Sequence, residues 1–386
     1  MDDPARILLV VSYGWFLSLG TRLVFPALLP QIRATFDITF TTAGLLLSLL
    51  WFAYAVGQFP GGLLADRIGE GRVLYLSSIV SGLTIGVVFV SSTPLTLAVG
   101  IVAFGFSTAL FSTTRFTVCS DLYPDRAGRA MGVTGAAGNV GNSVLPFVAG
   151  LVAVSSTWRY GVGYVVPLFV LAAVGVRAVV PTYTSESETP DEGLSAAFFR
   201  SLFSQVRNRS ILLVTAIHLL TMFTWQGFTG FFPTYLIEVK TFTPSTATAL
   251  FSLFFLLGVL VQPLSGACGD RFGPRWTLGV CFVFVSLSLA ALPFVDGLPG
   301  LVVVTVGVSG LLGISPVTMM VLSRSLPDGM KGSGLGLLRS VYILLASSGP
   351  FVVGSFADAG LFDEAFVLLS GVGCLALVLC FLLGRD

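Results

Sequence analysis

Four side chains that carry charge or can take up a proton stand inside long apolar runs of this sequence: Arg22, Arg115, His218 and Arg339. A charged residue at the centre of a membrane helix costs about 2.5–3.5 kcal/mol on insertion scales, so such residues usually mark functional sites. A guanidinium group can bind an anion through paired hydrogen bonds, and an imidazole can carry a proton. These residues are therefore the first candidates for chemistry.

Arg22 is the deepest of the four, in the segment YGWFLSLGTRLVFPALLP. Every Asp and Glu of the chain falls in an expected loop or at the end of an apolar run, so the sequence offers no counter-ion inside a span. A buried cation without a counter-charge is costly. We therefore expect Arg22 to lie at a solvated cavity and to bind the negative charge of a substrate. The alternatives are a structural arginine that is bonded to helix carbonyls, and a gate.

The other three residues lie nearer the ends of their runs. Arg115 and Arg339 are roughly 6 and 10 Å from the expected inner interface, at 1.5 Å per residue. Arg115 can extend toward that interface, to a structural role near Asp121 or Asp66, or it can contact substrate. For Arg339 a structural role and substrate contact are equally open. His218 is the only histidine and a candidate for proton coupling, because its ordinary pKa is about 6.5; a structural hydrogen bond is the alternative.

The composition places these residues in a membrane protein. Of 386 residues, 55% are hydrophobic and only 10% are charged, with a mean hydropathy of +0.94, whereas a soluble domain carries about 25% charged residues. The first apolar run follows two acids and precedes no cleavage site, so we interpret it as a retained span. The net charge of +1 says nothing about partners, and no basic stripe suggests nucleic acid as one.

A membrane-spanning helix needs about 20 mostly apolar residues. Twelve segments qualify, which predicts an all-α protein, with spans at about 7–29, 42–64, 73–92, 95–119, 129–153, 160–180, 211–236, 244–267, 276–294, 299–323, 333–356 and 364–383. The polar stretch 181–209 predicts a cytoplasmic linker between six-helix halves at 1–180 and 210–386. Leu194, Phe198, Leu202 and Val206 predict an amphipathic helix within that linker. Fourteen of the 20 basic residues fall on the side of both termini, which places the termini inside.

The two halves repeat each other at a constant offset of 204 positions. GGLLADRIGEGR at 61–72 aligns with SGACGDRFGPR at 265–275, so that Asp66 falls on Asp270, Arg67 on Arg271 and Gly69 on Gly273. The same offset pairs Gly132 with Gly336 and Pro146 with Pro350. Two parallel six-helix repeats are a known transporter plan, with substrate bound between them near the middle of the bilayer.

These two loops resemble the signature that members of the major facilitator superfamily carry between helices 2 and 3, often echoed between helices 8 and 9. The resemblance covers the whole chain and implies alternating access by rocking of the two halves. It also implies a gate, in which Asp66 caps the start of helix 11 and Arg67 and Arg72 pair with acids such as Asp121. The predicted gating residues are Asp66, Arg67, Arg72, Arg115, Asp121, Asp270 and Arg271. The alternative is that these charges only hold the topology.

The segment GVTGAAGNVGNSVLPFVAG at 132–150 is rich in glycine and predicts a helix that approaches its neighbour closely. It resembles the glycine-rich helix 5 motif of exporter branches, without that motif's Gly-Pro pair, and its GAAGNVGN is similar to a signature of the nitrate branch. Arg22 in helix 1 resembles the organophosphate-transporting branch. That branch has a second basic residue in helix 7, where this chain has Gln226, which favours a monoanion such as a carboxylate over phosphate.

The repeat also pairs polar residues within the spans. Gln226 is the mate of Arg22, and symmetry predicts that the two face each other across the central axis, with Trp225 as a flat wall. Gln58 and Gln262 form a second pair, for which helix packing is the alternative. The predicted substrate-binding residues are Arg22, Gln226, Trp225, Gln58, Gln262 and Arg339, with His218 for proton coupling.

The sequence therefore predicts a multi-pass secondary transporter of the plasma membrane, monomeric, that moves a small anion, most simply an organic carboxylate. It needs a proton, a sodium ion or an exchange substrate as its energy source, because the chain has no nucleotide-binding loop. No catalytic motif, metal site or cofactor is predicted, so an enzyme is not expected. The alternatives are a proton-linked exporter of hydrophobic compounds and a non-transporting sensor or partner subunit of the same fold.

Overall fold

The computed structural model describes residues 4–184, 209–325 and 331–383, which form helices and connecting turns without a strand. The described residues group into two compact units: Met1–Ser187 with Thr229–Leu256, and Glu188–Phe228 with Leu257–Asp386. Each is considered by itself. The predicted linker helix at 194–207 lies outside the described residues, and the predicted halves stay a prediction.

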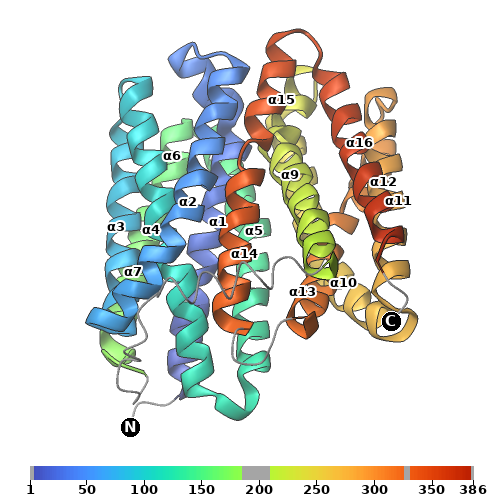
Figure 1. Ribbon diagram of the computed structural model, residues 1–386. Coiled ribbons are helices and arrows are strands. Elements are labelled where there is room, and N and C mark those ends of the chain that lie inside the picture. The colour runs from blue at the N-terminus through green and yellow to red at the C-terminus, as the bar shows by residue number, and fades with distance from the viewer. Residues whose placement is uncertain (1–3, 185–208, 326–330, 384–386) are drawn as a thin grey trace. The chain divides into compact units, whose positions relative to one another are not determined.

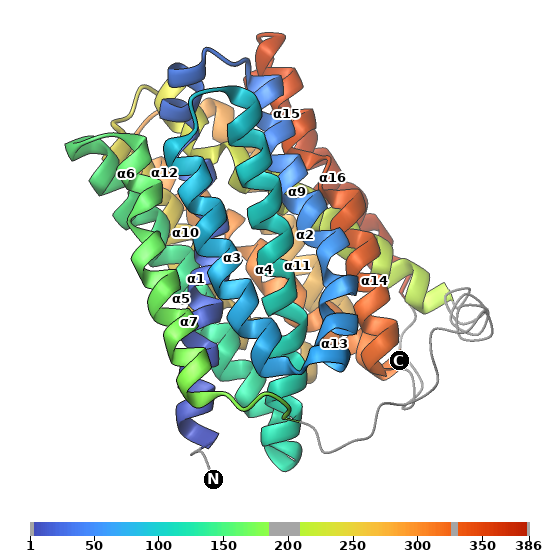
Figure 2. The same cartoon turned by 90° about the vertical axis from the view of Figure 1, so that its left-hand side faces the viewer.

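The first unit is built from the helices that Figure 1 draws in blue to green. They are α1 (Pro4–Phe36), α2 (Phe40–Ile68), α3 (Glu70–Val90), α4 (Pro94–Leu122), the 3-10 turn η1 (Pro124–Arg126), α5 (Ala127–Ser155), α6 (Trp158–Gly163) and α7 (Val165–Val179). α1 packs along α5, and α4 lies against both α2 and α3. α7 completes the unit by packing on α3 and α1, and Figure 2 shows α3 with α4 and α7 from the side.

The second part of the chain forms α9 (Arg209–Glu238), α10 (Pro244–Phe272), α11 (Pro274–Ala291), the 3-10 turn η2 (Leu292–Phe294), α12 (Leu298–Val308), α13 (Gly310–Ser325), α14 (Lys331–Ala346), α15 (Gly349–Asp358) and α16 (Phe362–Phe381). Within it α11 packs on α16, α12 and α13. α9 and α10 each contribute residues to both units.

The twelve predicted spans are confirmed. Within the described ranges, 12 helical segments are long and apolar enough to cross a membrane. Three of the spans are interrupted: α6 continues into α7 near the start of its span, and α12 continues into α13 and α14 into α15 nearer the middle of theirs. The orientation of the termini stays a prediction.

The glycine-rich segment at 132–150 forms most of α5, and its glycines let α5 touch α1. A Cβ atom added at Gly20 of α1 would overlap the backbone of Gly141, and one added at Gly141 would overlap the backbone of Phe16. Small residues permit this backbone-to-backbone approach between membrane helices. The contact lies two residues from Arg22, so it fixes the helix that carries the predicted anion ligand.

The repeated loops have the same backbone conformation. Gly69 joins α2 to α3 with φ 90° and ψ 148°, and Gly273 joins α10 to α11 with φ 86° and ψ 153°. A positive φ of this kind is available to glycine at little cost and to other residues only with strain. The glycines that recur at an offset of 204 therefore mark the same turn in each repeat.

Candidate functional site

Arg22 lies in the middle of α1 and has no solvent-exposed surface, with an exposed fraction of 0%. Its Nε donates a hydrogen bond to the Ser18 carbonyl oxygen, 3.0 Å away. This bond directs the Nε end of the guanidinium group toward the preceding turn of α1. The fork offers five N–H donors in one plane, and this bond uses one of them.

Three aromatic rings surround the Arg22 guanidinium. Its central carbon lies 3.9 Å from the ring centroid of Tyr54, 5.1 Å from that of Trp51 and 5.5 Å from that of Trp15. Tyr54 is fixed by a 2.8 Å hydrogen bond from its hydroxyl to Ser112 Oγ on α4. Aromatic faces attract a cation, most strongly where water is excluded. These three rings, which we name the aromatic cage, therefore stabilise the positive charge of Arg22 and supply flat apolar walls beside it.

Arg115 of α4 is a second buried cation at the same rings, with an exposed fraction of 4%. Its Nη1 donates to Thr134 Oγ1 of α5 at 2.7 Å, and its guanidinium carbon lies 4.2 Å from the Trp15 ring centroid. Arg22 and Arg115 thus share one indole, which places their guanidinium carbons within about 10 Å of each other. At an effective dielectric constant of 20, two like charges at that distance repel by about 1.7 kcal/mol.

The other predicted substrate ligands are found in two surroundings. Gln58 in α2 and Gln226 in α9 are buried, whereas Trp225, Gln262 and Arg339 are partly exposed. The side-chain oxygen of Gln226 accepts no hydrogen bond within the described parts of the chain. The predicted opposition of Arg22 and Gln226 stays a prediction, because the two residues belong to different units.

His218 is buried in the second unit, within electrostatic range of Arg339 on α14. Its Nδ1 lies 2.7 Å from Thr318 Oγ1 of α13, and its ring meets that of Tyr342 on α14 edge to face at 4.3 Å. The Thr318 hydroxyl also donates to the Ile314 carbonyl oxygen, 3.0 Å away. These contacts hold the imidazole in place; its role in proton coupling stays a prediction.

Two of the predicted gating residues, Arg67 and Asp121, bond a segment that follows α7. Asp66, Arg67 and Arg72 are exposed, and Asp121 accepts a 2.8 Å hydrogen bond from Thr184 Oγ1. The Thr184 backbone N–H donates to Glu70 Oε2 at 3.0 Å.

Two further bonds hold this segment, Pro181–Thr184, which we name the strap. The Gly71 N–H donates to the Thr182 carbonyl oxygen at 3.1 Å, and the Tyr183 hydroxyl donates to the Arg67 carbonyl oxygen at 3.3 Å. In the second loop Asp270 and Arg271 are exposed. The gating roles stay predictions.

The sequence matches the Major Facilitator Superfamily over residues 10–248 and 218–386. The chain belongs to this superfamily.

Similar proteins agree with that membership over nearly the whole chain. The cis,cis-muconate transport protein of Acinetobacter baylyi is 24% identical and covers 88% of this chain and 84% of its own. The hexuronate transporter of Bacillus subtilis is 21% identical, with 97% and 93% covered. A solved bacterial homolog of the human lysosomal transporter Spinster, in an inward-facing and occupied conformation, superimposes with a TM-score of 0.83. It is 15% identical and covers 99% of this chain and 97% of its own.

This member of the Major Facilitator Superfamily is therefore a secondary transporter of the cell membrane and not an enzyme. Its substrate is a small molecule, carried across by a bundle of twelve spans. The described residues contain no group of three or more His, Cys, Asp or Glu side chains that could hold a metal ion.

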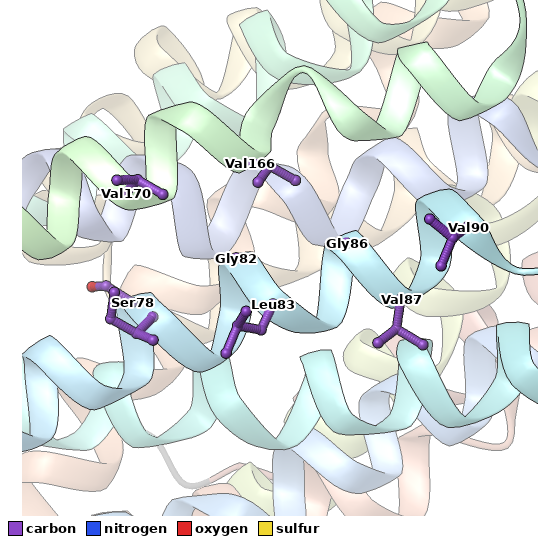
Figure 3. A pocket seen from close by; sticks show the side chains of 9 residues that line it. Ser78, Gly82, Leu83, Gly86, Val87, Val90, Val166 and Val170 are labelled. Atoms are coloured by element: carbon purple, nitrogen blue, oxygen red, sulfur yellow. The ribbon is translucent and has the colours of Figure 1, made fainter.

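Two grooves on the helices of this superfamily member are apolar. One, of about 370 Å³, lies between α3 and α7 and is lined by Gly82, Gly86, Val87, Val166 and Val170 among others (Figure 3). The other, of about 820 Å³, lies between α10 and α11 beside Phe272 and Trp276. Neither has a charged residue in its lining, so neither suits an anion.

Two parts of the site were not predicted from the sequence. Trp15 lies seven residues, or two helical turns, before Arg22, and Trp51 lies three residues before Tyr54. Both spacings put side chains on one face of a helix and were available as a signal. The polar composition of residues 181–184 places the strap in the predicted linker. Only the fold shows that it returns to the loop between α2 and α3.

Proposed function

We propose that this superfamily member transports a small organic anion, and that Arg22 binds the anionic group. The observation that carries the proposal is the full burial of Arg22 at the centre of α1 within an aromatic cage. Burying a cation in a membrane span costs free energy, so such a residue is taken as a candidate for a functional site. The muconate and hexuronate transporters, two relatives over most of the chain, are named for carboxylates, which supports the choice of anion.

The cage assigns a role to each group around the ligand. The guanidinium would hold a carboxylate through two parallel hydrogen bonds, which fixes direction as well as charge. Trp51 and Tyr54 would pack against the carbon skeleton, so they favour a flat or unsaturated one. Gln226, the repeat mate of Arg22, would orient the ligand from the second half.

Alternating access supplies the path. Because Arg22 is closed off from solvent in this structure, the helices around it must separate before an anion can bind or leave. A proton, a sodium ion or an exchanged anion would supply the energy. The predicted gate at Asp66, Arg67 and Asp270 would open and close the inner ends.

A thermal-shift screen of the purified protein tests the proposal. The ligands are small carboxylates, phosphate, nitrate, amines and lipophilic compounds, and the variants are Arg22→Gln and Arg33→Gln. Arg33 is a control on the same helix, half-exposed and paired with Glu238 at 3.6 Å. A ligand at 100 times its dissociation constant adds about 2.7 kcal/mol to the free energy of unfolding.

We expect carboxylates to stabilise the unmodified protein and Arg33→Gln, but not Arg22→Gln. Stabilisation by lipophilic compounds alone would reject the anion proposal in favour of the exporter alternative. Carboxylate binding that survives in Arg22→Gln would show that the anion binds elsewhere.

A further inference from the structure

The groove between α10 and α11 has features that transport of an anion leaves unexplained. It lies within the second unit and has a volume of about 820 Å³. Four of the side chains that line it are more than half exposed: Leu264, Phe272, Trp276 and Val280. Exposed apolar side chains on a membrane-spanning helix meet lipid tails, which are as apolar as leucine. The groove therefore opens toward the lipid.

The groove extends from the turn between the two helices toward the middle of the bilayer. Phe272 and Trp276 lie on either side of Gly273 at the turn, and Val261 lies eleven residues before Phe272 on α10. At 1.5 Å per residue this distance is about 16 Å. One leaflet occupies half of the hydrocarbon core, or about 15 Å. The groove thus has the length of a lipid chain in one leaflet, and Trp276 lies where tryptophan is enriched, at the membrane–water interface.

Two arginines, Arg271 and Arg275, lie at the turn where the groove ends. The Arg271 guanidinium carbon is 5.2 Å from the Phe272 ring centroid, and that of Arg275 is 5.3 Å from the ring centroid of Phe381 on α16. Neither forms an ion pair with an acid among the described residues. Asp270 is the acid of this loop, so two arginines against one aspartate leave the loop with a net positive charge. A guanidinium group binds phosphate through paired hydrogen bonds.

The first repeat differs at this place. At the offset of 204, Phe272 and Arg275 fall on Ile68 and Gly71. Ile68 packs against a buried core cluster, and the Gly71 N–H donates to a carbonyl oxygen of the strap. Protein therefore covers the first turn, whereas Gly273 has open space beside it within the described parts of the chain.

We propose that the groove binds one anionic phospholipid, with its phosphate on Arg271 and Arg275 and an acyl chain along α10 and α11. Basic pockets between membrane-spanning helices bind anionic headgroups in this way. The charge and the apolar length select the ligand together, since a free phosphate has no chain and a neutral lipid lacks the charge. The site is separate from Arg22, which belongs to the first unit, so the proposal goes beyond the proposed transport function.

Native mass spectrometry of the purified full-length protein in detergent tests the proposal. The probes are dioleoylphosphatidylglycerol, the zwitterionic dioleoylphosphatidylcholine, dioleoylglycerol and glycerol 3-phosphate. The last two carry the chains without the phosphate and the phosphate without the chains. The variants are Arg271→Gln, Arg275→Gln and the two combined. Arg177→Gln, which neutralises an exposed arginine in the last turn of α7, is the matched control.

We expect dioleoylphosphatidylglycerol to bind most tightly of the four. Each of Arg271→Gln and Arg275→Gln should weaken it about 5-fold and the combination about 30-fold, while Arg177→Gln should change it less than about 2-fold. Arg271→Lys should keep most of the affinity, because lysine still binds phosphate as a point charge. Cys268→Phe, which fills the groove, should weaken the two lipids that share the chains, phosphatidylglycerol and dioleoylglycerol.

Several results would overturn the proposal. Equal binding of phosphatidylglycerol and phosphatidylcholine would remove the charge selection, and an equal loss in Arg177→Gln would show attraction by surface charge in general. Glycerol 3-phosphate that binds as tightly as phosphatidylglycerol would make the loop a site for free phosphate. A dimer in the same spectra that the combined variant abolishes would assign this face to a second copy of the chain.

Unchanged lipid binding in Cys268→Phe would place the chains elsewhere and also reject the proposal. If that variant does not fold, Val280→Phe fills the same groove from an exposed position on α11 and decides the same point. None of these outcomes concerns carboxylate binding at Arg22, so the failure of the lipid site and the failure of the proposed function are distinguishable.

Discussion

The same helices of the two repeats carry different chemistry. In the first unit, α1, α4 and α5 surround Trp15 with two buried arginines. In the second, the corresponding helices α9, α13 and α14 hold His218 against Thr318 and Tyr342, with the partly exposed Arg339 within electrostatic range. At the offset of 204, Tyr342 stands where the first repeat has Gly138, which admits Trp15. The first copy thus has two buried arginines around a tryptophan, whereas the second has a buried histidine beside a tyrosine.

The loops of the two repeats diverge in a similar way. Gly69 and Gly273 have nearly equal dihedral angles, and among the residues that the structure describes only Gly69 has a backbone cover, the carbonyl of Thr182 in the strap. The residues that follow the two glycines also differ. Glu70 is buried, with an exposed fraction of 3%, and accepts a hydrogen bond from the strap, whereas the second repeat has Pro274 there. The two loops therefore share the turn and differ in the residue that follows it.

The contrast between close-packed and open glycines predicts the largest effect. Gly141→Val forces a branched side chain into the backbone of α1, so we expect it to lower the free energy of unfolding by about 3 kcal/mol or more. Gly132→Ala, on the same helix with open space around it, should be neutral or stabilise by up to about 1 kcal/mol. Thermal unfolding of both variants in detergent checks the pair, and equal losses would contradict the close approach of α1 and α5.

The two turn glycines form a matched comparison. Gly273→Ala should lose about 1–3 kcal/mol from backbone strain alone, because its combination of φ and ψ is essentially restricted to glycine. Gly69→Ala bears the same strain and also displaces the Thr182 carbonyl, so its loss should exceed that of Gly273→Ala by about 1 kcal/mol or more. Thermal shifts of the two variants measure the difference. An equal loss would mean that the strap moves away from the new side chain without lowering the free energy of unfolding.

The hydrogen bonds of the strap should contribute a smaller amount to the free energy of unfolding. Thr184→Val removes the hydroxyl that donates to Asp121 and keeps the size of the side chain, with an expected loss of about 1–2 kcal/mol. Thr243→Val, which removes the hydroxyl that caps α10 outside the strap, is the control for a loss of stability of similar size. Protease cleavage after Tyr183 should become faster in Thr184→Val only, and unchanged cleavage would argue against a bound strap.

The smallest expected effect on anion affinity is that of a change at His218. His218→Gln should change carboxylate affinity less than about 3-fold, because His218 lies in the second unit and the proposed carboxylate ligand Arg22 in the first. Isothermal titration measures it beside Arg22→Gln. A loss as large as that of Arg22→Gln would erase the functional distinction between the repeats, and a loss of proton-driven uptake alone would support proton coupling.

Much of the fold could be predicted, because membrane helices are recognised by their length and hydropathy. The internal sequence repeat also predicts that the same turn occurs twice. The twelve spans and the common turn at Gly69 and Gly273 follow from those patterns. The predicted closeness of α5 to a neighbour is also confirmed, although the sequence did not say that the neighbour is α1.

The site was less accessible to sequence reasoning. The depth of Arg22 could be counted along one helix, and its burial agrees with that count. The cage depends on Trp51 and Tyr54 from α2, which reach Arg22 only after two helices pack. For Arg115 the sequence leaves open a structural role near Asp121 or Asp66 and contact with substrate. Its observed partner Thr134 lies on another helix, at a register that no spacing rule within one helix can give.

The strap has a practical consequence for dividing the gene. Chain composition suggests a cut where the polar stretch begins, just before Pro181. Such a cut would transfer the residues that bond Glu70, Gly71 and Asp121 to the wrong fragment. A split or a fusion that is meant to leave the N-terminal fragment intact should be placed after Thr184.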